Sequence, residues 1–272
     1  MKDTFFSYPR FLNLCRKEVL ESWRSNVLRI ILLYGLMTIA MLWMAYFEYS
    51  RDGYSEIDPM WDTLLAIFVC FLFGGGCLSA SLTMERMKTK TSRISMLMTP
   101  ATSFEKFSVR WFIFTIVFLL IFLITYKMAD YTRVLVYSFA YPNTHTIIPL
   151  DFSYLIGDRD YGLSHHGWLL GFIVAVYFFF QSLFVLGSSI WPKNSFLKTF
   201  AAGSLIFLVY ISVATLLGKA LFEVGGNYNL FERKWTGEQV FCLLIIGCAL
   251  FTLVNWTIAY FRFKEAEILN RM

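Results

Sequence analysis

Residues 84–110 read MERMKTKTSRISMLMTPATSFEKFSVR, and they separate two of the most apolar stretches of the chain. Six of these residues are basic and two are acidic. Pro100 lacks the backbone N–H that a helix needs and disfavours helical geometry at the residue before it. Thr102 lies three residues before Glu105, which is the spacing of a capping box at the start of a helix. The segment therefore predicts a helix, a break and a second helix, and we interpret it as a docking surface for a soluble partner.

The composition of the chain predicts a membrane protein. Hydrophobic residues make up 57% of it and charged residues 16%, against about 25% charged residues in soluble domains. The apolar residues occur in blocks of about 20, the length of a helix that spans a bilayer. We expect an all-α integral membrane protein with one transmembrane domain over residues 1–272 and six spans, at about 28–47, 61–84, 109–126, 168–190, 199–217 and 239–261.

The basic residues predict the orientation of these spans. With six spans, 17 of the 24 Lys and Arg residues fall on the side of the two termini, but only 7 of the 19 Asp and Glu residues do. Because positive residues stay on the cytoplasmic side, we expect both termini and residues 84–110 to be cytoplasmic. The net charge of +5 is thus explained by membrane topology, and no nucleic-acid partner is expected.

An amphipathic helix is predicted before the first span, over residues 5–26. Leu12, Cys15, Val19 and Trp23 recur at helical spacing, with charged residues mostly elsewhere around the helix. Such a helix can lie in the headgroup layer of the membrane. Two interpretations remain open, a plain membrane anchor and a contribution to partner binding.

Candidate enzyme motifs are weak. His165 and His166 lie near Asp158, Asp160 and Ser164 in one loop, without the spacing of a known metal or catalytic motif. Gly162 and Gly167 have the spacing of the P-loop glycines, but Trp168 stands where the lysine is needed. The five cysteines also lack the spacing of metal ligands. We expect no catalytic, cofactor or metal site and no enzymatic activity in this chain.

Ion-coupled transport is disfavoured by the span interiors, which contain almost no ionisable residue. Gln181 and Asn255 are their most polar mid-span side chains, and each is expected to bond a neighbouring helix. Gly74, Gly75 and Gly76 allow either tight helix packing or a hinge.

Two stretches resemble the permease subunits of ABC-2 type ABC transporters, in particular those of Bacteroidetes-like bacteria. They are SRISMLMTPATSFEKFSVRW at residues 92–111 and FVLGSSIWPKNSFLKT at residues 184–199. The family order also matches: an interfacial N-terminal helix, six spans, and a cytoplasmic coupling helix between spans 2 and 3. Such permeases often have a re-entrant element before span 6, for which 219–224 is the candidate here.

The resemblance implies an ATP-driven exporter of the bacterial inner membrane. This chain and a second permease copy, identical or a sibling, would form the pathway, and separate ATPase subunits would bind ATP and Mg²⁺. Residues 94–105 would fit a groove on the ATPase, with apolar anchors and charged rim contacts. The residues implied in ATPase binding are Arg93, Ile94, Leu97, Met98, Pro100, Glu105 and Lys106.

Three alternatives stay open at this point. The chain could be a non-transporting membrane anchor or assembly protein, which predicts no ATPase partner. It could be a secondary transporter, which predicts transport by this chain alone under an ion gradient. Residues 84–110 could also be only a folded loop.

Overall fold

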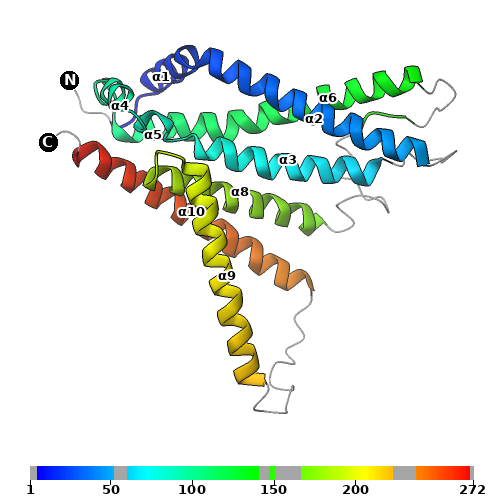
Figure 1. Ribbon diagram of the computed structural model, residues 1–272. Coiled ribbons are helices and arrows are strands. Elements are labelled where there is room, and N and C mark those ends of the chain that lie inside the picture. The colour runs from blue at the N-terminus through cyan, green and yellow to red at the C-terminus, as the bar shows by residue number, and fades with distance from the viewer. Residues whose placement is uncertain (1–4, 52–59, 141–146, 151–166, 223–236, 270–272) are drawn as a thin grey trace.

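The computed structural model describes residues 5–51, 60–140, 147–150, 167–222 and 237–269 (Figure 1). Within these ranges the chain forms helices and no strand. Six stretches are long and apolar enough to cross a membrane, which confirms the predicted all-α, multi-pass character. They are Trp23–Tyr49, Trp61–Met87, Ser103–Ala140, Leu170–Ile190, Ser195–Val213 and Phe241–Ala266.

The helices form a bundle with one outlying member. α8 (Gly167–Ile190) packs against both α10 (Gly237–Leu269) and α3 (Trp61–Ser81), and α2 (Trp23–Arg51) packs against α6 (Phe118–Ala140). α9 (Ser195–Phe222) leaves the bundle at an angle (Figure 1). The helix α1 (Tyr8–Glu21) lies at the same end of the bundle as the last turns of α10.

Two helices extend beyond the predicted ends of their spans. The third span was expected to end at residue 126, but the helix continues to Ala140 through Lys127, Asp130 and Arg133. These charged residues remain helical because they bond to one another and to neighbouring segments, a compensation that a hydropathy pattern cannot show. The second difference concerns 219–224, because α9 runs unbroken to Phe222 and no separate helix begins at Lys219.

The third span contains a π-helical turn. α5 (Ser103–Phe112) continues through η2 (Ile113–Val117) into α6. The turn widens the backbone, and the carbonyl oxygen of Phe114 accepts hydrogen bonds from Ser79 Oγ of α3, at 2.8 Å, and Gln181 Nε2 of α8, at 3.5 Å. Gln181 thus bonds a neighbouring helix, as the sequence predicted. Asn255 does the same, since its Nδ2 donates to Ser182 Oγ at 3.0 Å.

Close helix packing depends on particular glycines. A Cβ at Gly76 would lie 2.6 Å from the Tyr177 ring, and one at Gly187 would lie 1.9 Å from Thr199 Oγ1. α3 passes through Gly74, Gly75 and Gly76 without a break, so the structure supports packing at this site and shows no hinge. The turn from α8 to α9 also needs Asn194, which adopts a φ of 54° that few residues other than glycine and asparagine tolerate.

A buried ion pair closes the bundle at the end remote from α1. Asp130 and Arg133 are both fully buried, and Arg133 Nε donates to Asp130 Oδ1 at 2.9 Å. Arg133 also donates to the Tyr49 hydroxyl and, at 3.0 Å, to the carbonyl oxygen of Ile148. Asp130 Oδ2 accepts from the backbone N–H of Leu150 at 2.7 Å. We call this group the Asp130 cluster; it ties α2 and residues 147–150 to α6.

Candidate functional site

Residues 84–110 form the helix, break and helix that the sequence predicted. After the single turn η1 (Glu85–Met87), α4 (Lys90–Leu97) is capped by Thr89, whose side chain accepts from the N–H of Ser92 at 3.4 Å. The chain turns around Pro100 and enters α5 at Thr102. Here the predicted capping box is complete, because Thr102 Oγ1 accepts from Glu105 N–H at 3.3 Å and Glu105 Oε2 accepts from Thr102 N–H at 3.1 Å.

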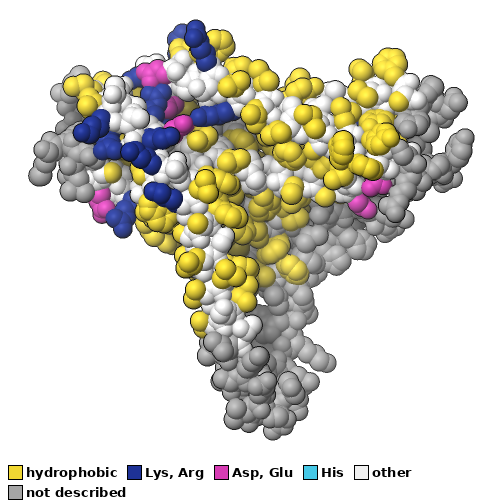
Figure 2. Space-filling view, viewed as in Figure 1, with side chains coloured by type: hydrophobic (Ala, Val, Ile, Leu, Met, Phe, Trp, Pro, Cys, Tyr) yellow, Lys and Arg dark blue, Asp and Glu magenta, His cyan; other side chains and the backbone are white. Residues whose placement is uncertain are grey.

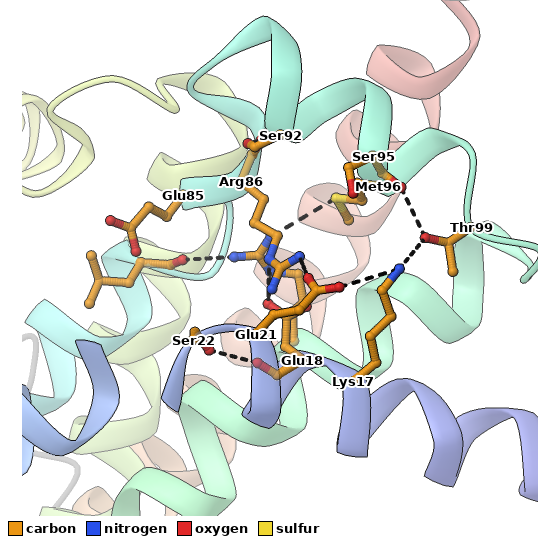
Figure 3. Close-up of polar contacts among 12 residues, drawn as sticks. Lys17, Glu18, Glu21, Ser22, Glu85, Arg86, Ser92, Ser95, Met96 and Thr99 are labelled. Atoms are coloured by element: carbon orange, nitrogen blue, oxygen red, sulfur yellow. Dashed lines mark hydrogen bonds and ion pairs between the residues drawn. The ribbon is translucent and has the colours of Figure 1, made fainter. Parts of the chain in front are cut away.

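Ion pairs join α1 to this segment. Arg86 Nε lies 3.0 Å from Glu18 Oε1, and the same guanidinium also pairs with Glu21. Lys17 Nζ lies 3.7 Å from Glu21 Oε1 and donates to Thr99 Oγ1 at 3.2 Å. Figure 3 shows Glu18 and Glu21 reaching from α1 toward Arg86. The charged side of α1 therefore faces the protein.

The apolar stripe of α1 points the other way. Leu12, Cys15, Val19 and Trp23 were predicted to share one side of this helix. Leu12, Val19 and Trp23 are exposed and Cys15 is half-buried, and Trp23 stands at the start of α2. A soluble amphipathic helix does the reverse and buries its apolar side. The exposed stripe is suited to contact with lipid, while the ion pairs hold the opposite side.

Glu105 attaches the N-terminal residues to α5. Its side chain is fully buried, and its Oε1 accepts from Ser7 N–H at 2.8 Å and from Arg10 Nη2 at 2.8 Å. The rings of Phe5 and Phe104 stack beside it with centroids 4.9 Å apart. Glu105 was expected to contact a partner, but the structure places it inside the fold, where each carboxylate oxygen already accepts a bond.

Two cations are buried next to these ion pairs. Lys106 is 5% exposed and Arg110 is 3% exposed. Arg110 Nη2 donates to the carbonyl oxygen of Leu82 at 3.3 Å, and its Nε lies 3.9 Å from Glu18 Oε1. Lys106 was predicted to make an exposed rim contact, but it lies inside the fold because it follows the capping turn on the inward face of α5. We call Lys17, Glu18, Glu21, Arg86, Lys106 and Arg110 the basic cluster.

The pKa of Glu21 reflects this environment. Partial burial alone would raise it, but hydrogen bonding to Arg86 and the positive charges of Arg86 and Lys17 keep the pKa of Glu21 below its ordinary value. Glu21 is therefore a carboxylate at neutral pH and serves as a counter-charge for the neighbouring cations.

The outer face of α4 carries exposed apolar residues. Ile94 is 54% exposed and Met98 is 80% exposed, and Pro100 is exposed beside them. Met96 points inward and is buried with Met84, Met87, Phe107, Phe184, Val185, Ala80, Ala259 and Phe263. This core joins α4 to the ends of α3, α8 and α10, so the exposed apolar pair sits on a braced helix.

The structure brings together only part of the predicted site. Arg93, Ile94, Met98 and Pro100 lie on or beside α4, and Arg93 Nη2 donates to the carbonyl oxygen of Met87 at 2.9 Å. Leu97 ends α4, but its side chain lies outside the described part of the structure. Sequence reasoning missed the pairing of α1 with Arg86 and Arg110. The available signal was the opposite charge of Glu18 and Glu21, but no pattern in the sequence assigned their partners.

The charges of the described residues are distributed unevenly over the surface. Figure 2 shows Lys and Arg side chains gathered at the end that holds α1 and α4, while hydrophobic side chains cover much of the rest of this face. Lys88 and Lys90 are exposed next to α4. The exposed pair Ile94 and Met98 therefore lies in a basic setting suited to a partner with an apolar groove and an acidic rim.

The described residues hold no group of three or more His, Cys, Asp and Glu side chains that could bind a metal. All three histidines, with Asp158, Asp160, Ser164 and Gly162, lie outside the described residues. No protein-family model, curated protein or solved structure matches the chain.

Proposed function

We propose that this chain is the transmembrane subunit of an ATP-driven exporter of the ABC-2 type, and that α4 couples it to a separate ATPase subunit. The observation that carries the proposal is the outer face of α4, where Ile94 and Met98 are exposed on a helix braced from two sides. A lone apolar pair on a mobile loop would transmit little force. A pair fixed to α1, α3, α8 and α10 can transmit the movement of a bound partner to the spans.

The connections of residues 84–110 indicate which spans a movement of the ATPase would reach. α3 enters it through η1, and the third span leaves it through α5. A push on α4 therefore acts on the ends of two spans that also contact each other. ATP and Mg²⁺ would be bound by the ATPase, and this chain would supply the membrane pathway without enzymatic activity of its own.

A second permease copy would complete the pathway. α9 supports this part of the proposal, since its exposed apolar side chains include Leu205, Phe207 and Leu208 and it stands apart from the bundle (Figure 1). In a cysteine-free background, an oxidant should link two copies through Leu208→Cys more efficiently than through Leu250→Cys on α10, which is also exposed. Equal linking at both positions would argue against α9 as the contact.

The central experiment is co-purification of the tagged chain from its native host. We expect a protein with a P-loop ATPase sequence in the purified complex, and we expect Ile94→Asp with Met98→Asp to remove it while the chain remains in the membrane. Ser95→Asp is the matched control, because Ser95 is exposed on the same helix and receives the same charge. Wild-type yield of the ATPase with the double variant would contradict the assignment of α4.

Two further observations would replace the proposal with one of the alternatives. Transport by the purified chain alone under an ion gradient would favour a secondary transporter. A Ser95→Cys variant should react with a membrane-impermeant maleimide only after the cells are permeabilised, and labelling in intact cells would place α4 on the wrong side of the membrane.

A further inference from the structure

A pocket lies between α1 and residues 84–110 and is lined mainly by cations. It is a small pocket of about 30 Å³ and is partly open to solvent. Leu14, Lys17 and Glu18 line it from α1, and Arg86 lines it from η1. The remaining lining residues are Met96, Thr99, Lys106, Val109 and Arg110. Four of these residues are cationic and one is acidic. The exposed pair Ile94 and Met98 does not line the pocket.

The charges of the pocket are not balanced by the carboxylates next to it. Glu18 faces both Arg86, at 3.0 Å, and Arg110, at 3.9 Å. Glu21, which pairs with Arg86 and Lys17, adds a second negative charge beside the pocket. Lys17, Arg86 and Arg110 thus share two carboxylates. Because buried charge is unfavourable without a counter-charge, this arrangement favours an additional anion.

Arg110 supplies a second and independent observation. Its side chain is 3% exposed, yet its Nε has no hydrogen-bond partner among the described residues. Its other nitrogens make long contacts, 3.3 Å to the carbonyl oxygen of Leu82 and 3.9 Å to the sulfur of Met96. A buried guanidinium normally has its donors satisfied by oxygen acceptors. Arg110 is also one of the residues that line the pocket.

We infer that the pocket binds a phosphate group. A phosphate offers several strong acceptors to converging Arg and Lys side chains, and guanidinium groups bind it in a bidentate manner. The bound group bridges Lys17 of α1 to Arg86 of η1 and to Lys106 and Arg110 of α5, and so holds α1 against the segment.

Two sources can supply this phosphate, an anionic lipid headgroup and free inorganic phosphate. The exposed apolar stripe of α1 places the pocket beside lipid, and basic pockets at a membrane surface are common headgroup sites. The inference does not rest on an ATPase partner, so it can fail or hold separately from the proposed function.

The test uses the purified full chain in detergent mixed with phosphatidylcholine. Its thermal unfolding is followed while phosphatidylglycerol, or separately inorganic phosphate, is added at constant ionic strength. A rise in unfolding temperature with phosphatidylglycerol alone identifies the lipid headgroup, and a rise with inorganic phosphate identifies the free ion. If neither addition raises the unfolding temperature above that of a chloride control, the inference is overturned.

Variants then locate the effect. Arg110→Gln should weaken the apparent affinity for the stabilising anion about tenfold, the equivalent of one charge-assisted hydrogen bond. Lys17→Gln, at a half-exposed residue that tolerates change, should weaken it about threefold and serves if Arg110→Gln does not fold. Lys90→Gln is the matched control, because Lys90 is exposed in the same segment but does not line the pocket. Equal weakening by Lys17→Gln and Lys90→Gln overturns the assignment of the site.

Discussion

The two ends of the bundle both contain ion pairs, but the pairs differ in burial and in charge balance. In the Asp130 cluster one positive charge, Arg133, faces one negative charge, Asp130, and both side chains are fully buried. Their hydrogen bonds to each other, to Ile148 and to Leu150 are 2.7 to 3.0 Å long. In the basic cluster Lys17, Arg86 and Arg110 share two carboxylates, and one contact is as long as 3.9 Å. A balanced pair fastens helices together, whereas an unbalanced group retains capacity for a further anion.

The largest effect is expected from breaking the balanced pair. Asp130→Ala leaves Arg133 buried without its counter-charge, and we expect a loss of about 3–5 kcal/mol in the free energy of unfolding. SDS titration of the purified protein, followed by tryptophan fluorescence, measures this loss. The double variant Asp130→Leu with Arg133→Met should be more stable than Asp130→Ala, because it leaves no unpaired charge. A double variant that is less stable than the single one would show that the ion pair itself provides the stability.

Variants of Glu105 test whether every ion pair at the end that holds α1 contributes less to stability than the Asp130 cluster does. It is a saturated carboxylate like Asp130, so Glu105→Ala should cost about 2–3 kcal/mol and release residues 5–10 from α5. SDS titration gives the stability, and limited proteolysis reports the release of the N-terminal residues. Glu105→Gln keeps one oxygen acceptor, for either Ser7 or Thr102, and should lose less. Equal losses in the two variants would mean that the charge, through Arg10, dominates.

The basic cluster should respond asymmetrically. Without anionic lipid or phosphate, Glu18→Gln should cost about 1 kcal/mol, since it removes a counter-charge from two cations. Arg110→Gln should cost less, because it relieves the excess of positive charge. The same SDS titration compares them. If Arg110→Gln destabilises the protein as strongly as Asp130→Ala, the basic cluster is balanced and the distinction between the two ends is wrong.

The smallest effect concerns acidification. Because the pKa of Glu21 is lowered in the folded state, its contribution to stability is present above the ordinary carboxyl pKa and is lost as the pH falls through the lowered value. The contact of α1 with Arg86 should therefore weaken below about pH 4. Hydrogen exchange of the backbone amides of α1 at a series of pH values, corrected for the intrinsic exchange rate, measures the contact. Glu21→Gln should make it less dependent on pH; an unchanged profile would assign the effect to another group.

Much of the fold could be predicted because it follows from local patterns. The six apolar blocks, the break at Pro100 and the capping box of Thr102 with Glu105 depend on residues close in sequence. The end of the helix that contains the third span could not be predicted in this way. Asp130 and Arg133 stay helical because their partners include Tyr49 and Leu150, which are distant along the chain.

The candidate site was predictable only on its outer face. Ile94 and Met98 are exposed as the short apolar run before Pro100 indicated. The resemblance to ABC-2 permeases implied that Glu105 and Lys106 belong to the same surface, but both are buried. A charged side chain is expected to be exposed only when the fold offers it no oppositely charged partner. Here α1 brings Arg10 to Glu105 from a distant part of the sequence.

The π-helical turn at 113–117 determines how α4 is oriented about the axis of the third span. Each residue of an α-helix rotates the chain by about 100°, and a π turn accommodates one additional residue within an otherwise regular helix. Removing a single residue from this turn while keeping the helix regular would therefore swing everything N-terminal to it through roughly a quarter of a revolution relative to α6. The number of residues in this turn therefore sets the direction in which Ile94 and Met98 face, although the turn lies well away from them in sequence.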